Sequence, residues 1–392
     1  MKKKLLIAGG GYADIPLILA AQKMGFYVIT SGNREEDLGH QYSDEYRKAD
    51  FSDKEKMLEL AQELGIDAVC PCCNDFSALS CAYIAEQIGL PGHDPLQTAE
   101  ILHHKDNYRM FAAANDILSP KAESFSDSIN ALKSIHKFKF PVIVKPVDLT
   151  GGKGVSKINS LSEAKQAVET AFLLSKAKRV VIEEFIEGTN HGLSTFIRDG
   201  KVVFYFADNE HYFLNKYMVS GASTPGDVPK EAIETLVWES EKIASLLKLK
   251  DGIFHIQFIL KDMTPYIIEI CRRPPGDLYI DFVKYATGVD YPSYIVKAFA
   301  GLSIDDLSHA APHGFYTRHC VMTDQTGTVQ DVVFEESINN NIIDKFMWWK
   351  QGDVIADVTT QKFGIVFLKY DSNEDMNKKV LQLNNLIQVI SI

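Results

Sequence analysis

The segment that decides the fold reads Phe140-Pro141-Val142-Ile143-Val144-Lys145-Pro146, and the loop after it reads Asp148-Leu149-Thr150-Gly151-Gly152-Lys153-Gly154-Val155. Three β-branched residues between prolines are typical of a short buried strand. A buried strand does not tolerate an unpaired ammonium group, so we expect Lys145 at its end to meet an anion. The glycines of the loop let backbone N–H groups approach an anion, and Lys153 adds positive charge. The segment therefore predicts a strand and loop that bind phosphate.

A P-loop is excluded here, because Lys153 is followed by Gly154-Val155 and not by a Ser or Thr that opens a helix. A non-functional alternative stays open at this point. In that interpretation the segment is a strand with a surface lysine and a flexible hairpin.

Composition limits the class of protein. The chain has 392 residues, of which 46% are hydrophobic, enough for two or three packed units. Its net charge of -11 disfavours nonspecific binding to nucleic acid, which requires a basic face. No apolar run approaches the roughly 18 residues of a membrane span, and Leu5–Ala8 is too short for a signal peptide. We expect a cytoplasmic protein that binds neither nucleic acid nor a membrane.

The six cysteines follow no secreted-framework spacing, which favours reduced thiols. The run Cys70-Pro71-Cys72-Cys73 suggests a metal site only weakly, because no second Cys/His cluster matches it. Structural thiols at a strand end are the favoured interpretation.

The first 93 residues alternate between strands and helices. Strands are expected at 3–8, 27–30 and 68–70, and helices at 14–24, 54–64 and 75–88, a pattern that predicts a parallel sheet. The turn Gly9-Gly10-Gly11 invites an NAD-binding interpretation. However, Asp14 stands where the third glycine of that fingerprint belongs, and Thr30-Ser31-Gly32 offers no carboxylate for a ribose. An NAD-dependent oxidoreductase is therefore kept only as a weakly supported alternative.

After the break at 89–95, rich in Gly and Pro, the pattern changes to helices and antiparallel hairpins. Helices are expected at 96–103, 106–114, 128–136, 162–175 (with Ser162 as a cap) and 230–247, and a strand at 180–182. A hairpin joins 192–198 to 201–207 around Asp199-Gly200. A second hairpin joins 252–260 to 265–270 and should place Gln257 beside Glu269, facing one pocket. Short strands follow Pro312, with one helix near 373–385.

Taken in order, the candidate residues are Lys105, Lys145, the loop 151–154, the segment 183–186, Gln257, and Glu269 with Arg272-Arg273. This order resembles the ATP-grasp superfamily over roughly residues 1–310. The tail looks like the terminal region of L-amino acid ligases. The resemblance implies an α/β and α+β fold in three parts. They are a parallel-sheet domain (1–93), a two-lobed ATP-grasp domain with nucleotide between antiparallel sheets (94–310, lid about 120–190), and a small α+β subdomain (311–392).

The resemblance also implies roles for individual residues. Lys105 and Lys145 would clamp the phosphates of ATP. The loop Gly151, Gly152, Lys153, Gly154 would close over the β- and γ-phosphates. Glu183 would accept from the adenine amino group, the backbone of the run Glu184, Phe185, Ile186 would read the adenine edge, and His191 would touch the ribose. For His191, a surface turn histidine is the alternative.

Gln257 and Glu269 would hold Mg²⁺, with Mn²⁺ as a substitute. The family often has Asn where this chain has Cys271, and a neutral thiol is a poor magnesium ligand. One strongly held ion, or Glu269 bridging two, fits better, and compensation by Asp277 or Asp281 stays open.

Arg273 falls on the catalytic arginine of the family, where it would stabilise developing negative charge. Arg272 is a second catalytic candidate, with a structural salt bridge as its alternative. The segment Pro274–Asp277 should border the acceptor pocket, with His211, Tyr212 and Tyr217 as candidate lining.

The resemblance implies an ADP-forming ligase that activates a carboxylate as an acyl phosphate and couples it to an amine, with amino acids as one candidate pair. Its partners would be small molecules, and dimers are common among relatives. Two alternatives remain within nucleotide binding: a bicarbonate-activating enzyme like carboxylases or carbamoyl phosphate synthetase, and a regulator that binds nucleotide without catalysis.

Overall fold

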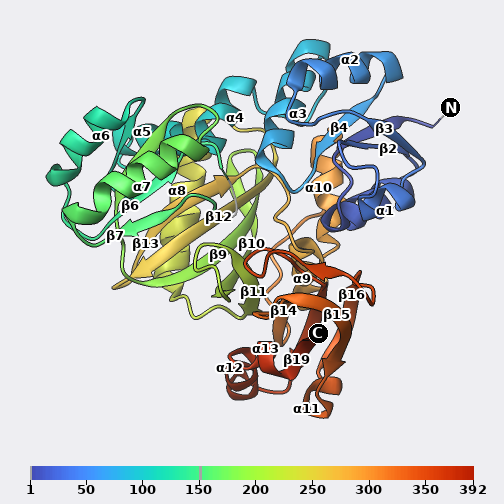
Figure 1. The fold of residues 1–392 in the computed structure, drawn as a ribbon. Coiled ribbons are helices and arrows are strands. Elements are labelled where there is room, and N and C mark those ends of the chain that lie inside the picture. Colours follow the sequence, from blue (N-terminus) through green and yellow to red (C-terminus); the bar gives the residue numbers. More distant parts are fainter. Residues whose placement is uncertain (1, 150–151) are drawn as a thin grey trace.

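The computed structural model describes residues 2–149 and 152–392, which form one parallel and three antiparallel sheets (Figure 1). The parallel sheet lies at the N-terminal end of the chain. A small antiparallel sheet stands apart from it, and a long antiparallel sheet runs through the centre of the molecule. No helix within these residues is long and apolar enough to cross a membrane.

The N-terminal sheet has the strand order β3-β2-β1-β4, and all of its pairs are parallel, as predicted. The central strand is fully buried from Leu5 to Ala8 because helices cover both faces of the sheet. Helices α2 and α3 have the predicted bounds. The elements are β1 (Lys4–Ala8), η1 (Tyr12–Asp14), α1 (Ile15–Lys23), β2 (Tyr27–Gly32), η2 (Leu38–Tyr42), β3 (Glu45–Lys48), α2 (Lys54–Leu64), β4 (Ala68–Pro71) and α3 (Asp75–Ile88).

Side chains of the protein occupy the space around the glycine turn that follows β1. The carboxylate of Asp14 accepts from the N–H groups of Gly11 at 2.8 Å and Cys73 at 3.1 Å. A Cβ at Gly10 would lie 2.1 Å from the His40 ring. The turn is thus packed against side chains, which argues against the NAD-binding interpretation.

Two helices, α4 (Leu96–His103) and α5 (Lys105–Ala114), lead to the small antiparallel sheet, of strand order β5-β8-β6-β7. The predicted strand at Lys145 is β6, and all five of its residues are buried. The N-cap of α7 is Ser160, so the prediction of Ser162 as a cap was wrong by two residues. The elements are β5 (Ala122–Phe125), α6 (Ser128–Ser134), η3 (Ile135–Lys137), β6 (Val142–Pro146), β7 (Ser156–Ile158), α7 (Leu161–Leu174) and β8 (Val180–Glu184).

The central sheet has eight strands in the order β13-β12-β9-β10-β11-β14-β18-β16. Both predicted hairpins belong to it, and Gln257 pairs directly with Glu269, as expected. Helices α9 and α10, which follow β13, pack between this sheet and α1 of the N-terminal part. The elements up to α10 are β9 (Thr189–Arg198), β10 (Lys201–Tyr212), β11 (Val219–Thr224), α8 (Lys230–Leu247), β12 (Gly252–Lys261), β13 (Thr264–Cys271), α9 (Tyr279–Thr287) and α10 (Tyr291–Phe299).

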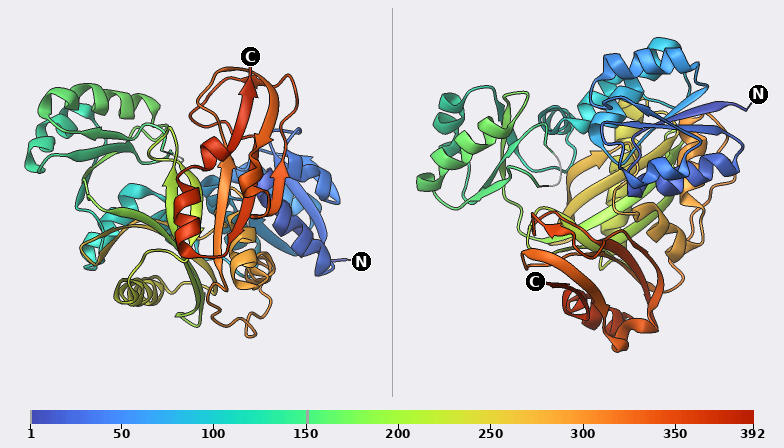
Figure 2. Two further views of the ribbon diagram at one scale, coloured as in Figure 1. Left: turned by 90° about the horizontal axis from the view of Figure 1, so that it is seen from below. Right: turned by 45° about the vertical axis from the view of Figure 1, so that its right-hand side comes forward.

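The C-terminal residues continue this sheet, because β14 pairs antiparallel with β11 across the expected boundary at 310/311 (Figure 2). A three-stranded sheet, β17-β15-β19, closes a separate apolar cluster. The helix expected over 373–385 is two short helices. The elements are β14 (Phe315–Val321), β15 (Gly327–Phe334), α11 (Glu336–Asn339), β16 (Ile342–Met347), β17 (Val354–Ile355), β18 (Gly364–Tyr370), α12 (Asn373–Val380), α13 (Leu383–Leu386) and β19 (Ile387–Ser391).

Candidate functional site

A cavity of about 660 Å³ is lined by the small sheet, the central sheet, residues 73–75 of the N-terminal part, and Arg318 and Lys362 of the C-terminal part. Most of the predicted site residues line it, although they come from positions far apart in the chain. Those that do are Lys105, Lys145, Gly152, Glu183, Glu184, Phe185, Ile186, Gln257, Glu269 and Arg273. Gly151 lies outside the described residues.

Lys145 lies on β6 and is 4% exposed, and its Nζ donates to Glu183 Oε1 at 2.6 Å. The second oxygen of Glu183 accepts from Arg109 Nε at 3.0 Å. Burial lowers the pKa of Lys145 to about 8, although Glu183 opposes this change. Burial also works against ionised Glu183, but Arg109 and Lys145 hold its pKa below the usual value. The anion that Lys145 was expected to meet is therefore, within the chain, Glu183.

This pairing alters the interpretation of Glu183. Both of its carboxylate oxygens are used by Lys145 and Arg109, and the residue is 4% exposed. Its observed contacts orient the lysine ammonium, and they differ from the predicted contact with an adenine amino group.

Lys105 starts α5, and its Nζ donates to Glu269 Oε1 at 3.1 Å and to the Leu149 carbonyl at 3.0 Å. Burial lowers the pKa of Lys105, but Glu269 and Asp75 outweigh it and raise the pKa above normal. This lysine therefore connects β13 to the beginning of the glycine-rich loop. We call Lys105, Lys145, Gln257 and Glu269 the lysine end of the cavity.

Gln257 and Glu269 are directly opposite one another on β12 and β13. Gln257 Nε2 donates to Glu210 Oε1 at 2.6 Å, which brings a third oxygen-bearing side chain beside the pair. These are the hard oxygen donors that Mg²⁺ prefers. No group of three or more His, Cys, Asp or Glu side chains suited to a metal occurs within residues 2–149 and 152–392. Gln257 and Glu269 thus offer two oxygen ligands that fit a magnesium ion, with Glu210 in contact with Gln257.

Cys271 is 4% exposed, and burial raises the pKa of its thiol, which keeps it neutral. It follows Glu269 by two residues on β13 and lines the cavity, but it offers a poor ligand for magnesium. Asp277 does not replace it as a free ligand, because its carboxylate accepts from Lys362 Nζ at 2.6 Å and from Tyr12 OH at 2.6 Å.

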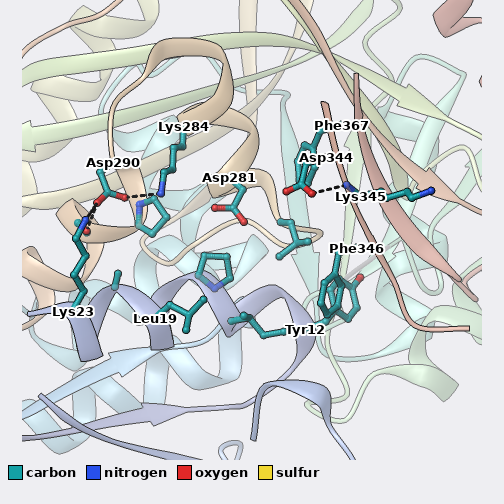
Figure 3. A pocket seen from close by; sticks show the side chains of 16 residues that line it. Tyr12, Leu19, Lys23, Asp281, Lys284, Asp290, Asp344, Lys345, Phe346 and Phe367 are labelled. Atoms are coloured by element: carbon teal, nitrogen blue, oxygen red, sulfur yellow. Dashed lines mark hydrogen bonds and ion pairs between the residues drawn. The ribbon is translucent and has the colours of Figure 1, made fainter. Parts of the chain in front are cut away.

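Asp281 lines a different pocket, of about 260 Å³, between α1, α9 and the strands β16 and β18 (Figure 3). In Figure 3 its carboxylate lies among Tyr12, Lys284 and Asp344. It is not among the residues that line the cavity with Glu269, so it does not compensate for Cys271.

The two neighbouring arginines have different surroundings. Arg273 lines the cavity, and its Nε donates to Asp75 Oδ1 at 2.9 Å, which also pairs with His103 Nδ1 at 3.0 Å. Arg272 is buried outside it. Its guanidinium donates to Asp94 Oδ2 at 2.8 Å and to the backbone carbonyls of Ile253 and Lys250. Arg272 has the structural role that was its alternative, and its placement gives no support to catalysis.

Three further predicted residues do not line the cavity. His191 is 2% exposed, its Nε2 lies 2.6 Å from Thr189 Oγ1, and its ring stacks on Phe258. Lys153 and Gly154 are also absent from the lining. Gly152 does reach it, with φ of 71° and so little room that an added Cβ would lie 2.5 Å from Tyr217 Cβ. Tyr217 and Tyr212 line the cavity and His211 does not.

Several cavity residues were missed from sequence, namely Asp75, Asp208, Glu210, Arg318 and Lys362. Asp208 and Glu210 follow the predicted end of their strand at Ala207, whereas β10 continues to Tyr212. A longer strand would have placed 208, 210 and 212 on one face. Arg318 and Lys362 come from the tail, where no motif marks them. We call Asp208, Glu210 and Arg318 the carboxylate end of the cavity.

Comparisons with known proteins agree with this geometry. Residues 119–277 match a family model described as ATP-grasp domain. An L-amino acid ligase from Bacillus licheniformis superposes with a TM-score of 0.84 and 21% identity, over 100% of this chain and 99% of that one. The biotin carboxylase domain of a Hydrogenobacter thermophilus 2-oxoglutarate carboxylase was solved with MgADP and bicarbonate. It superposes with a TM-score of 0.79 and 16% identity, over 100% of this chain and 91% of that one.

Among curated proteins, the C-terminal section of a carbamoyl phosphate synthase large chain from Methanocaldococcus jannaschii is 23% identical over 339 residues. The match covers 78% of this chain, which spans about half (52%) of that relative.

The protein is thus an α/β protein with an ATP-grasp domain. The superfamily resemblance seen in the order of the motifs is confirmed by the match to residues 119–277. The similar structures share its fold along the whole chain.

Proposed function

We propose that the protein is an ATP-dependent ligase that phosphorylates a carboxylate, releases ADP, and transfers the acyl group to an amine. The observation that carries the proposal is the convergence of Lys105, Lys145, Gln257, Glu269 and Arg273 on one cavity between two antiparallel sheets. The ligase and carboxylase names of the similar proteins support the same class of chemistry.

In this proposal the triphosphate of ATP lies at the lysine end. Lys145 and Lys105 would neutralise phosphate oxygens, each exchanging part of its present contact with Glu183 or Glu269. The backbone from Glu184 to Ile186, at the end of β8, would read the adenine edge, since these residues line the cavity. Gly152 also lines the cavity and would contact ATP through its backbone.

Gln257 and Glu269 would hold Mg²⁺, with Glu210 beside them, and Mn²⁺ has the same preference for oxygen ligands. A bound magnesium ion would supply charge neutralisation of the phosphates during transfer. Glu269 would contribute a formal negative charge there, whereas Gln257 would contribute a neutral amide oxygen, so Glu269 would be the stronger ligand.

The reaction has two steps. A carboxylate oxygen of the acid attacks the γ-phosphorus, and the bond to the β-phosphate oxygen breaks, so ADP leaves. The amine nitrogen then attacks the carbonyl carbon of the acyl phosphate, phosphate leaves with the former carboxylate oxygen, and the amine loses a proton. Arg273, fixed by Asp75, would stabilise negative charge on the acyl phosphate and on the tetrahedral oxyanion.

Water would destroy the acyl phosphate, so the site must exclude it. The loop that contains Gly152 packs on Tyr217, which lies between β10 and β11 of the central sheet. We expect the cavity to close by contact between this loop and the central sheet.

The test is a product assay with the purified chain, ATP, Mg²⁺ and paired acids and amines. ADP and phosphate should appear in stoichiometric amounts only when both an acid and an amine are present. Formation of AMP would contradict the proposal. ADP formation that depends on bicarbonate and needs no amine would indicate a carboxylase instead.

A further inference from the structure

The carboxylate end of the cavity contains two acidic side chains without a cationic partner. Asp208 is 1% exposed and accepts a hydrogen bond from Tyr279 OH, and Glu210 accepts from Tyr212 OH at 2.5 Å and from Gln257. Within the described residues, neither carboxylate has an ion pair. Burial and the nearby charge of Glu210 raise the pKa of Asp208 to about 7. A buried carboxylate such as Asp208 is costly unless a ligand satisfies it, and Glu210 beside it is partly buried.

The backbone directs Asp208 toward the reaction centre. Glu269, Gln257, Gly192 and Asp208 occupy one row across the neighbouring strands β13, β12, β9 and β10. An added Cβ at Gly192 would lie 2.7 Å from Asp208 Oδ2, so the carboxylate lies over the bare backbone of β9. The glycine thus leaves room for Asp208 beside the proposed metal ligands.

A buried cation faces the same end. Arg318 is 2% exposed and lines the cavity, and its Nε has no hydrogen-bond partner within the part of the chain that the structure describes. Its Nη1 donates to the Asp277 carbonyl at 3.2 Å and to Cys320 Sγ, and it lies 3.7 Å from Asp277 Oδ2, so the guanidinium has one ion pair while its Nε side has no partner. Glu210 pairs with Ala222 and Ala222 with Arg318, so Glu210 and Arg318 are two strands apart, roughly 10 Å between Cα atoms. Both side chains and Ala222 between them line the same cavity, and the charge of Arg318 acts to lower the pKa of Glu210 against the larger effect of burial, which raises it.

The carboxylate end contains side chains of both charges, which limits the kinds of ligand that can bind there. A simple carboxylate would satisfy Arg318 but be repelled by Asp208 and Glu210, and a simple amine would leave the guanidinium Nε unpaired. A zwitterion with adjacent ammonium and carboxylate groups satisfies all three side chains.

We propose that the carboxylate end binds one substrate as an α-amino acid zwitterion, with Asp208 and Glu210 receiving its ammonium group and Arg318 its carboxylate. The inference rests on the proposed ligase function and adds the chemical class of one substrate to it. Asp208 and Arg318 are then the residues that determine specificity for amino acids over other acids and amines.

The test is calorimetric binding to the full chain with Mg²⁺ and a non-hydrolysable ATP analogue, so that no turnover is needed. The twenty proteinogenic L-amino acids are screened first. The one that binds best is compared with its analogue lacking the amino group and with its analogue lacking the carboxylate, for example propionate and ethylamine for L-alanine. We expect the amino acid to bind at least roughly 30-fold more tightly than either analogue, because each lacks one buried charge pair.

Two variants separate the charges. Asp208→Asn should weaken binding of the amino acid roughly 30-fold or more and should not weaken binding of the deaminated acid, which loses a repulsive charge. Arg318→Met should weaken binding of both the amino acid and the acid. Asp262→Asn, in the exposed turn between β12 and β13, is a matched control and should change nothing. Analogue affinity equal to that of the amino acid, or an amino-acid affinity unchanged by Asp208→Asn, would overturn the proposal.

The outcome is separable from that of the ligase proposal. If no amino acid binds while other acid and amine pairs still give ADP and phosphate, the amino-acid assignment is wrong and the ligase function stands. If amino acids bind with the predicted variant pattern but no pair yields ADP, the ligase function is wrong and the binding site stands.

Discussion

The two ends of the cavity differ in how their charges are balanced. At the lysine end each ammonium already has a carboxylate: Lys145 pairs with Glu183 at 2.6 Å and Lys105 with Glu269 at 3.1 Å. At the carboxylate end Asp208 has a tyrosine hydroxyl and no cation within the described residues. Arg318 Nη1 lies 3.7 Å from Asp277 Oδ2, but its Nε lacks a hydrogen-bond partner in that part of the chain. Each end combines buried and partly buried side chains, so the ion pairs of the two lysines distinguish the ends better than exposure does.

The presence or absence of ion pairs before a ligand binds affects both the stability of a site and its selectivity. A paired site is stable by itself, and its ligand must exchange one partner for another. An unpaired site costs folding free energy that a complementary ligand restores, which favours that ligand over analogues lacking one charge. Removing a charge should therefore have opposite effects on stability at the two ends.

The largest expected effect is at the lysine end. Glu269→Gln removes the charged metal ligand and leaves Lys105 without its carboxylate, so we expect kcat for ADP formation to fall roughly 1,000-fold and the protein to lose stability. Steady-state kinetics and thermal unfolding measure both changes. Glu234→Gln, an exposed residue on α8 paired with Lys230, is the control. An unchanged kcat would remove Glu269 from the site.

Arg272 and Arg273 are neighbours in the chain, but only Arg273 lines the cavity. Substituting each of them tests whether lining the cavity is what makes an arginine catalytic. Arg272→Met breaks a buried pair with Asp94, so we expect about 3–5 kcal/mol less stability with nucleotide affinity unchanged. Arg273→Lys keeps the charge and should lower kcat with a smaller loss of stability. Chemical unfolding and ADP-formation kinetics distinguish these results. A catalytic defect in a still-folded Arg272→Met protein would contradict the assignment.

At the carboxylate end, Asp208→Asn should stabilise the protein. With its pKa raised to about 7, mainly by burial, folded Asp208 keeps a proton that the unfolded chain releases near pH 4. The free energy of unfolding therefore falls as pH rises from 4 to 7, by up to about 4 kcal/mol from this group. The variant should lose this slope and be more stable than the wild type at pH 8. Denaturant unfolding across pH measures it, and an unchanged slope would contradict the buried-charge account.

The smallest expected effect is at Cys271. Cys271→Asn offers an oxygen ligand beside Glu269, so we expect the Mg²⁺ concentration for half-maximal activity to fall by about threefold to tenfold. Magnesium titration of ADP formation measures this change. Cys271→Ser, with a smaller hard ligand, should lie between the two proteins. A higher magnesium requirement for the Asn variant would show that the thiol is needed for packing.

Much of the fold could be predicted, because periodicity and turn signals are local. The helices 54–64, 75–88 and 230–247 have the expected bounds, and the hairpin at Lys261-Asp262 set the pairing of Gln257 with Glu269. The continuation of the central sheet through β14 was not predictable in this way. The pairing of β11 with β14 joins residues about a hundred positions apart, and no local pattern specifies it.

The candidate site was predicted where motif order constrains it and missed where partners come from distant elements. Lys145 was expected to meet an anion, but the sequence did not show that Glu183 and Arg109 would supply the contacts. The predicted strand ended at Ala207, whereas β10 continues to Tyr212. Asp208 and Glu210 were therefore not predicted as residues of the site. His191 was assigned to a ribose by resemblance, whereas its ring packs on Phe258 in the core.

The most direct test of the central claim follows the oxygen atoms of the acid. The acid and amine selected by the ADP assay are supplied with the carboxylate of the acid labelled with ¹⁸O, and the released phosphate is analysed by mass spectrometry. Activation as an acyl phosphate predicts one labelled oxygen in each phosphate released. Label recovered in AMP, or phosphate that carries none, would contradict the account.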